Sequence, residues 1–187
     1  VYNAASPFSE GKAFVTKGSK QYFINQKNQR ALKIKDPGLG FAEEFGGQFK
    51  NGFCVMMQYQ DTKSAMGLIG AIDEKGKTVV PFEYEFPMEY MGPFPRHFSG
   101  GILITHQNGK WGAVDENGKV IIKHKYADIS DFEFGVAFVQ EDEEIGGIFI
   151  ESDIDGKRNY WIDKRKKRII PANKYDYVSP VIYDGLI

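Results

Sequence analysis

Cysteine is almost absent from this chain, because Cys54 is the only one among 187 residues. A single thiol forms no internal disulfide and cannot supply the several thiolates of a structural zinc site. Long apolar runs are also missing, whereas a membrane-spanning helix needs about 20 consecutive apolar residues. We therefore expect no membrane span and a fold that depends on side-chain burial and backbone pairing.

Neither sign of charge is in excess. The 24 Lys and Arg residues nearly balance the 25 Asp and Glu residues, which leaves a net charge of -1. A protein that recruits nucleic acid through its phosphates normally carries a basic field, so we expect no nucleic-acid partner. With 42% hydrophobic and 14% aromatic residues, the chain can bury one good core, which favours a single domain over residues 1–187.

One pattern recurs four times along the chain, and such repeats indicate a repeat architecture. Its first part is a Phe, two spacer residues, a Gly and a short apolar run. Its second part is a short apolar segment that ends in Asn or Asp, and its third part is an apolar segment after a polar turn. The first parts begin at Phe8, Phe49, Phe98 and Phe132, the second parts end at Asn25, Asp73, Asp115 and Asp163, and the third parts lie at 31–33, 78–81, 120–123 and 168–171.

Within each copy the local pattern favours β-strands. The apolar runs are short, rich in Val, Ile, Phe and Tyr, and bounded by Gly, Asn, Asp or Pro. No segment keeps apolar residues at helical spacing over about ten residues. Segments 73–77 and 115–119 predict tight hairpins, because Gly76 and Gly118 can adopt the positive φ that closes such a turn. Segment 164–167 has no Gly, so we expect a wider or strained hairpin there.

These elements predict an all-β protein of four antiparallel units, each with three or four short strands. Such units bury their faces only by stacking on neighbours. Both a closed, propeller-like ring and an open twisted array satisfy this requirement. The approximate units are 8–48, 49–97, 98–131 and 132–187.

The third copy carries a family resemblance. Residues 109–122 read GKWGAVDENGKVII and are followed by Tyr126, and this run resembles the bacterial WG-repeat family, also called KWG. The second copy has Ile69 where the family has Trp, and the fourth has Trp161 at a shifted position without the Gly. The resemblance implies a β-rich repeat module of bacterial proteins, often exported or attached to other domains, without established catalytic activity and with an expected binding role. It implies no functional residues.

Three groups of residues that point to small-ligand chemistry have simpler interpretations. Segment 70–78 has five residues between its glycines, one more than a phosphate-binding P-loop. Segment 152–157 resembles part of a calcium loop, but Ile162 stands where that loop needs Glu. His97, His106 and His124 lack metal-ligand spacing, and Cys54 lies in an apolar segment. We therefore expect no cofactor, no metal and no enzyme activity.

Two groups of residues are candidates for binding. Aromatic rings outside the repeat positions would provide contact area at a low entropy cost. A basic run in the fourth copy could hold a phosphate, an acidic glycan or the acidic face of a protein, or it is simply a charged hairpin tip that blunts a sheet edge. The candidates are Tyr90, Phe94, Arg96 and His97 in an insert and Lys164, Arg165, Lys166 and Lys167 in the basic run.

The patterns lead to the hypothesis of a non-catalytic binding or scaffold module that contacts a protein or the cell envelope. The alternatives are recognition of a carbohydrate or envelope polymer by the insert aromatics, an enzyme with its site near residues 90–97, and a structural spacer between other domains. The start at Val1 rather than Met favours a periplasmic or extracellular protein over a cytoplasmic one. The oligomeric state stays open.

Overall fold

A computed structural model describes residues 1–32, 34, 41–59, 67–87, 96–141, 144–145, 148–149 and 159–169. Of residues 41–46, 144–145, 148–149 and 159 it describes the backbone. All regular structure in these residues is β-strand. Accordingly, the described residues contain no helix with the length and apolar character that a membrane crossing requires.

Four antiparallel sheets follow one another along the chain, and we call them units 1 to 4. Unit 1 contains β1 (Ala4–Ala5), β2 (Lys12–Lys17), β3 (Lys20–Asn25) and β4 (Arg30–Leu32). Unit 2 contains β5 (Phe41–Lys50), β6 (Phe53–Tyr59), β7 (Gly67–Asp73) and β8 (Thr78–Glu85). Unit 3 contains β9 (Ile102–Gln107), β10 (Lys110–Asp115) and β11 (Val120–Tyr126). Unit 4 contains β12 (Asp128–Ile129), β13 (Val136–Gln140) and β16 (Asn159–Asp163), and its insert holds the small hairpin of β14 (Glu144–Ile145) and β15 (Ile148–Phe149).

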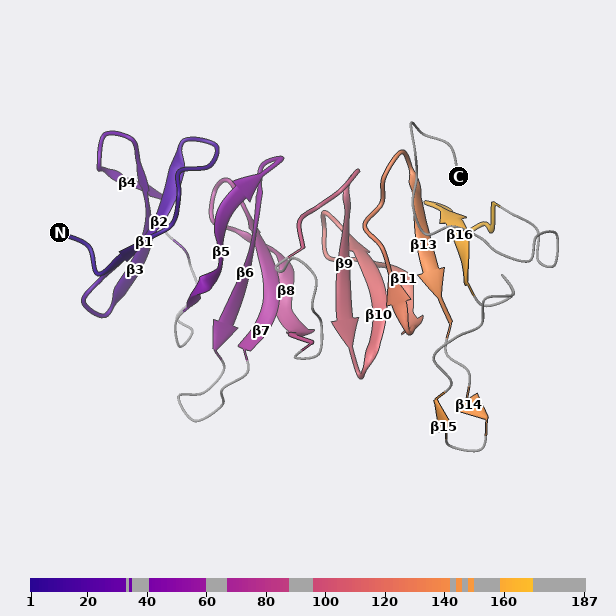
Figure 1. The fold of residues 1–187 in the computed structure, drawn as a ribbon. Helices are drawn as coiled ribbons and strands as arrows, with labels where there is room; N and C mark the ends of the chain where they lie inside the picture. Colours follow the sequence, from indigo (N-terminus) through magenta and orange to yellow (C-terminus); the bar gives the residue numbers. More distant parts are fainter. Residues whose placement is uncertain are drawn as a thin grey trace.

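The four units lie in a row, with unit 1 at one end and unit 4 at the other (Figure 1). The described residues form no closed barrel or ring, and each pair of neighbouring units shares one buried cluster. The prediction of an all-β repeat fold is confirmed. Of the two expected arrangements, the described residues adopt the open one.

Alternate residues of the central strands of units 2 and 3 face opposite neighbours. In β6, Cys54 packs against unit 1, whereas Val55 packs against unit 3. In β9, Leu103 packs against unit 2 and Ile104 against unit 4. A strand that is buried on both faces has apolar residues at successive positions rather than at alternate ones. This burial explains why the repeats read as continuous apolar runs.

The Phe-x-x-Gly motif is a two-residue hairpin turn in every unit, and we call these four turns the tip turns. The residues on either side of each turn pair with one another, as Ser99 does with Ile102. Positive φ at both central residues defines a type I′ turn, which matches the twist of the strands that it joins. The central residues are Glu10 and Gly11 (φ 48° and 74°), Asn51 and Gly52 (55° and 81°), Gly100 and Gly101 (57° and 81°), and Phe134 and Gly135 (50° and 85°).

The Asn or Asp at the end of each second part closes another hairpin. In unit 3, Oδ1 of Asp115 accepts hydrogen bonds from the backbone nitrogens of Asn117 (2.8 Å) and Lys119 (3.0 Å). Asp73 makes the equivalent bonds in unit 2, to the nitrogens of Lys75 and Lys77. The tight hairpins expected at 73–77 and 115–119 are therefore confirmed.

The Gly-free hairpin of unit 4 has the same width as the others. Asp163 N donates to Lys167 O (3.0 Å), and Lys166 N donates to Asp163 O (2.8 Å). Lys166 has a φ of 65°, close to the 77° of Gly118. The expectation of a wider hairpin is wrong, because the turn has the same backbone hydrogen bonds as the others. The expectation of a strained hairpin is right, because Lys166, a residue with a Cβ atom, takes the left-handed conformation.

The Gly of the WG dipeptide is explained by a close approach of β11. A Cβ atom at Gly112 would lie 2.7 Å from the carbonyl oxygen of Ile122 and 2.8 Å from the ring of His124. At Gly70 in unit 2, a Cβ would lie 2.7 Å from the ring of Phe82. Such contacts leave no room for a methyl group. In both units the glycine therefore leaves room for a side chain of the next strand, His124 in unit 3 and Phe82 in unit 2, to pack over the strand that carries the glycine.

Candidate functional site

The predicted site residues of the insert are only partly described. Tyr90 and Phe94 lie outside the described residues. Arg96 is buried, with its guanidinium 4.6 Å from the centre of the Trp111 ring. The same guanidinium donates to the carbonyl oxygen of Ile129 and forms ion pairs with Asp128 (3.7 Å) and Asp131 (3.5 Å). Arg96 therefore ties the WG tryptophan of unit 3 to the start of unit 4.

His97 lies half-buried beside the same contact. Its pKa is lowered, first by burial and then by the charge of Lys50, whereas Asp131 opposes this shift. Among the described residues, its Nδ1 atom has no hydrogen-bond partner. The ring is therefore a neutral group of the contact between units at neutral pH.

His106 and His124 come together where unit 2 meets unit 3, although their sequence spacing indicates no relation. Nδ1 of His106 lies 3.1 Å from Oε2 of Glu85, and Nε2 of His124 lies 2.9 Å from Oγ1 of Thr105. The ring of Tyr84 stacks on His124 with centroids 5.5 Å apart. Burial is the main cause that lowers the pKa of both histidines. Within the described residues, no three His, Cys, Asp or Glu side chains gather as a metal site would require.

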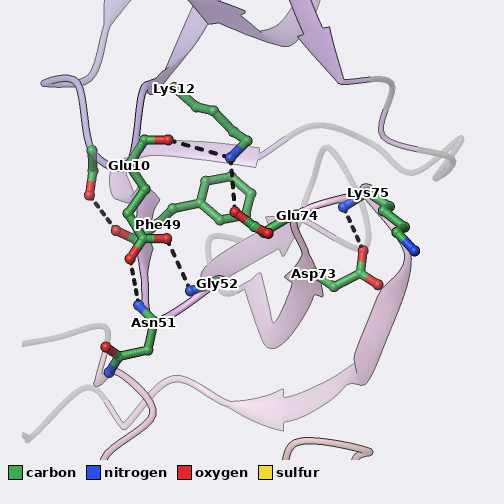
Figure 2. A network of polar contacts seen from close by, with 9 residues as sticks. Glu10, Lys12, Phe49, Asn51, Gly52, Asp73, Glu74 and Lys75 are labelled. Carbon is green, nitrogen blue, oxygen red and sulfur yellow. Dashed lines mark hydrogen bonds and ion pairs between the residues drawn. The ribbon is translucent and has the colours of Figure 1, made fainter.

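Two turns hold a carboxylate from the preceding unit. Figure 2 shows Glu10 of unit 1, whose two carboxylate oxygens accept from the backbone nitrogens of Asn51 (2.7 Å) and Gly52 (3.0 Å) in the tip turn of unit 2. Glu85 of unit 2 does the same in unit 3, where it accepts from Asn108 N (3.1 Å) and Gly109 N (3.4 Å). Successive N–H groups in a turn form a small anion-binding surface.

A lysine lies beside the first of these carboxylates. Nζ of Lys12 is 3.4 Å from the backbone oxygen of Glu10 and 3.4 Å from Oε1 of Glu74 in unit 2 (Figure 2). It also lies 4.6 Å from the centre of the Phe49 ring. The contact between the tips of units 1 and 2 thus combines a turn, a carboxylate, a cation and an aromatic ring.

The tips of units 3 and 4 line an open surface pocket of about 470 Å³, which we call the tip pocket. Phe134, in the tip turn of unit 4, lines it and is 77% exposed. Lys164 lines it as well, and its Nζ donates to the backbone oxygen of Gly100 (2.7 Å). The full lining comprises Ser99, Gly100, Phe132, Glu133, Phe134, Gly135 and Lys164.

The predicted basic run forms the hairpin turn beside this pocket. Lys164, Arg165, Lys166 and Lys167 are all exposed, and Lys164 is the member that reaches the tip pocket. Nε of Arg165 lies 3.8 Å from Oδ2 of Asp163. Phe134 is a surface residue that was not among the candidates from the sequence. A signal was present, since the other copies have Glu10, Asn51 and Gly100 at this position.

The comparison with known families agrees with the repeat. The sequence pattern of the WG containing repeat matches residues 1–20, 69–111 and 111–144, which together make up more than half of the chain. No curated protein and no solved structure matches the chain. The matched segments include the Trp111–Gly112 dipeptide, whose glycine the fold requires, and three of the four tip turns, those of units 1, 3 and 4. The chain therefore belongs to the family of proteins built from the WG containing repeat.

Proposed function

We propose that this WG-repeat array is a non-catalytic binding module that holds a partner at the tips of units 3 and 4. The observation that carries the proposal is Phe134, which is 77% exposed and has a φ of 50°. A bulky residue in the left-handed region costs roughly 1 to 2 kcal/mol, and an exposed ring gains nothing from the core. A residue that stabilises neither the turn nor the core is best explained by contact with a partner.

The residues equivalent to Phe134 in the other three tip turns each have a structural reason to be there. Asn51 and Gly100 are residue types that tolerate positive φ, and Glu10 uses its carboxylate to hold the next unit. Phe134 has neither property. Exposed aromatic rings next to a pocket are frequent centres of binding energy in interfaces.

Charge beside the pocket supports an acidic or polar partner. Lys164, Arg165, Lys166 and Lys167 form the turn beside Phe134 and Gly135. A ring for apolar contact and a group of cations on one edge suit a protein surface that carries both apolar and acidic side chains. A carbohydrate or envelope polymer is the alternative ligand class, with Tyr90 and Phe94 as its candidate residues.

The absence of catalysis is part of the proposal, and the positions of the reactive side chains support it. His106 and His124 are held in the contact between units 2 and 3. Cys54 is fully buried, and burial raises the pKa of its thiol to about 12, so the nucleophilic thiolate does not form at neutral pH. These groups serve the stacking of the units. A reproducible hydrolytic or transfer activity that vanished with one polar substitution would overturn this part.

The experiment compares Phe134→Asn with Phe8→Asn. Phe8 is a second exposed ring, at 50% exposure, in unit 1 at the other end of the row. A random peptide display library and a glycan array are both screened against the wild-type chain and the two variants. We expect peptides that bind the wild type and Phe8→Asn and are lost with Phe134→Asn.

Three other results would count against the proposal in different ways. Peptides that bind Phe134→Asn as tightly as the wild type would place the binding site elsewhere. Glycans that are lost with Phe134→Asn would change the ligand class. No ligand from either screen would favour the structural spacer.

A further inference from the structure

We infer that the tip pocket binds a carboxylate of a partner protein, presented as an acidic side chain next to an apolar one. This inference rests on the proposed function and adds the chemistry of the ligand. Its starting point is the contact between units 1 and 2, where the chain supplies the same kind of ligand to itself. Glu10 holds both backbone nitrogens of the central residues of the following tip turn, Asn51 and Gly52.

The contact between units 3 and 4 has the same parts except for the carboxylate. The position of Glu10 is taken by Gly100, which has no side chain. The backbone nitrogens equivalent to those of Asn51 and Gly52 belong to Phe134 and Gly135. Within the described residues, neither nitrogen has a hydrogen-bond acceptor, and both residues line the tip pocket. The pocket therefore lies where a carboxylate would complete the contact.

A cation is already in place at the same point. At the first contact, Lys12 lies beside the backbone oxygen of Glu10. At the last contact, Lys164 donates to the backbone oxygen of Gly100, the equivalent atom. Lys164 reaches it from the opposite unit, because it occupies the position that Glu74 has in unit 2. Two N–H groups and one ammonium group are the donors that a single carboxylate can accept from.

At the contact between units 2 and 3, the residue equivalent to Glu10 is Asn51. The side-chain amide of Asn51 donates to the backbone oxygen of Phe98 (3.5 Å). The first central residue of the tip turn thus reaches the following unit with its side chain at the first two contacts, whereas Gly100 has no side chain at the third. The third contact is also the one with the exposed ring of Phe134.

The other charges at the pocket set its selectivity. Glu133 lines the pocket and opposes an anion, whereas Lys164 attracts one. Asp163 is occupied, because its Oδ1 atom accepts from the nitrogens of Arg165 and Lys167 (2.8 Å each). Asp131 is paired with Arg96. Among the residues that line the pocket, one cation faces one acid, which favours a singly charged carboxylate over a doubly charged phosphate.

An acidic peptide fits better than a small anion. The volume of about 470 Å³ exceeds that of a single carboxylate, and Phe132 and Phe134 supply apolar lining. The internal example is itself a Glu side chain carried by a β-turn. The occupant is therefore a Glu or Asp with an apolar neighbour that covers Phe134.

The first experiment follows the amide signals of the whole ¹⁵N-labelled chain during titration with sodium acetate, with sodium chloride at matched ionic strength as the reference. We expect saturable shifts at the amides of Phe134 and Gly135 and none at Asn51 and Gly52, which Glu10 already holds. Lys164→Ala weakens acetate binding about tenfold, since a charge-assisted contact is lost. Lys167→Ala, with the same loss of charge in the same turn, leaves it unchanged.

Gly100→Glu is the most specific variant, because it supplies the missing carboxylate from within the chain. Glu10 has a φ of 48° and Gly100 one of 57°, so a Glu fits this backbone. A Cβ at Gly100 would meet only the mobile end of Lys164, whose Nζ lies 2.7 Å away. We expect Gly100→Glu to fold, to shift the Phe134 and Gly135 amides without any ligand and to abolish the acetate response. Gly100→Ala adds the same Cβ atom without a carboxylate, so the Phe134 and Gly135 amides still respond to acetate, although more weakly because the Cβ displaces Lys164.

The second experiment identifies the ligand class with N-acetyl-Glu-Phe-amide, glucuronate and inorganic phosphate as probes. We expect the peptide to bind at least about tenfold more tightly than the two others, because Phe134 contributes apolar contact only to the peptide. Tighter binding of glucuronate or phosphate would overturn the assignment to a peptide. A wild-type acetate response in Gly100→Glu, or no saturable response in the wild type, would overturn the carboxylate site.

The two proposals fail separately. Displayed peptides that are lost with Phe134→Asn but bind Gly100→Glu and Lys164→Ala normally would leave the binding module intact and remove the carboxylate site. Peptides that bind Phe134→Asn normally would remove the proposed function itself.

Discussion

The guanidinium of Arg96 lies 4.6 Å from the centre of the Trp111 ring and is almost fully buried there. The tryptophan that gives the repeat its name is thus covered by a cation that also pairs with two aspartates at the start of the next unit. The WG strand therefore stabilises the contact between units as well as its own sheet.

We expect Arg96→Ala to lower the free energy of unfolding by about 2 to 3 kcal/mol, because a desolvated cation–π contact and a buried hydrogen bond are lost together. Urea unfolding followed by Trp fluorescence measures this loss. Asp128→Asn is the control, and it changes the free energy of unfolding by less than about 1 kcal/mol, since Asp128 is half exposed. An Arg96→Ala variant as stable as the wild type would contradict this account of the contact.

Gly112→Ala tests the close approach of β11 to the WG strand. We expect it to lower the free energy of unfolding by about 2 to 3 kcal/mol, because a Cβ would lie 2.7 Å from the backbone oxygen of Ile122. Gly109→Ala is the comparison, since nothing lies within 4 Å of its Cβ position and only its φ of 72° opposes the change. We expect Gly109→Ala to lower the free energy of unfolding by about 1 kcal/mol. Equal losses in the two variants would show that β11 gives way to the methyl group.

Lys166→Gly is expected to raise the free energy of unfolding. Lys166 has a φ of 65°, and a glycine removes the strain of the left-handed conformation, for a gain of about 0.5 to 1 kcal/mol. Thermal unfolding followed by circular dichroism records the gain as a higher midpoint. Lys167→Gly, at the neighbouring position without positive φ, lowers the midpoint, because the glycine relieves no strain and raises the conformational entropy of the unfolded chain. The same sign of change in both variants would argue against strain at Lys166.

Phe134→Asn is expected to stabilise the chain although it removes the binding residue. Asn before Gly is the favoured pair for a type I′ turn, so the free energy of unfolding rises by about 0.5 to 1 kcal/mol. Chemical unfolding of the variant beside the wild type is sufficient to measure it. A destabilised variant would mean that the Phe134 ring contributes to folding, and the argument for a partner would lose its support.

Stability is expected to fall as the pH falls below neutral. The pKa values of His97, His106 and His124 are all lowered in the folded chain, mainly by burial, so the unfolded chain binds more protons below its histidine pKa of about 6.5. The contribution of the histidines is complete above that pH and is lost as the pH falls from there through the lower folded pKa values. Unfolding in urea between about pH 7.5 and pH 5 tests this trend.

His124→Gln provides the control for the pH dependence. The amide keeps a polar partner for Thr105 but does not titrate. We expect a shallower loss of stability with acidification than in the wild type. An unchanged slope would assign the effect to His97 and His106 alone.

Local sequence patterns predicted the strands and the Asp hairpins, because both depend on neighbouring residues. Asp73 and Gly76 lie within one turn, and their bonds can be inferred from the turn itself. The tip turns were harder to recognise. Phe98 and Gly101 were taken as the start of a strand, whereas Gly101 is a central residue of a turn in which Ser99 pairs with Ile102.

Contacts between units could not be predicted from the sequence, since they depend on how whole sheets stack. Nothing in the spacing of His106 and His124 places them together, and nothing near Arg96 indicates that Trp111 lies beneath it. The tip pocket is a similar case. It arises because Gly100 stands where Glu10 stands in unit 1, and this difference matters only once the two tip turns are superimposed on the same fold.

The alternation of Cys54 and Val55 toward opposite neighbours makes the two faces of a unit different from each other. In units 2 and 3 one face meets the preceding unit and the other the following one, so the array has a direction. A duplicated unit inserted into the gene would find a matching face on either side. The number of units can therefore change during evolution while each tip turn, with or without its own carboxylate, is varied independently.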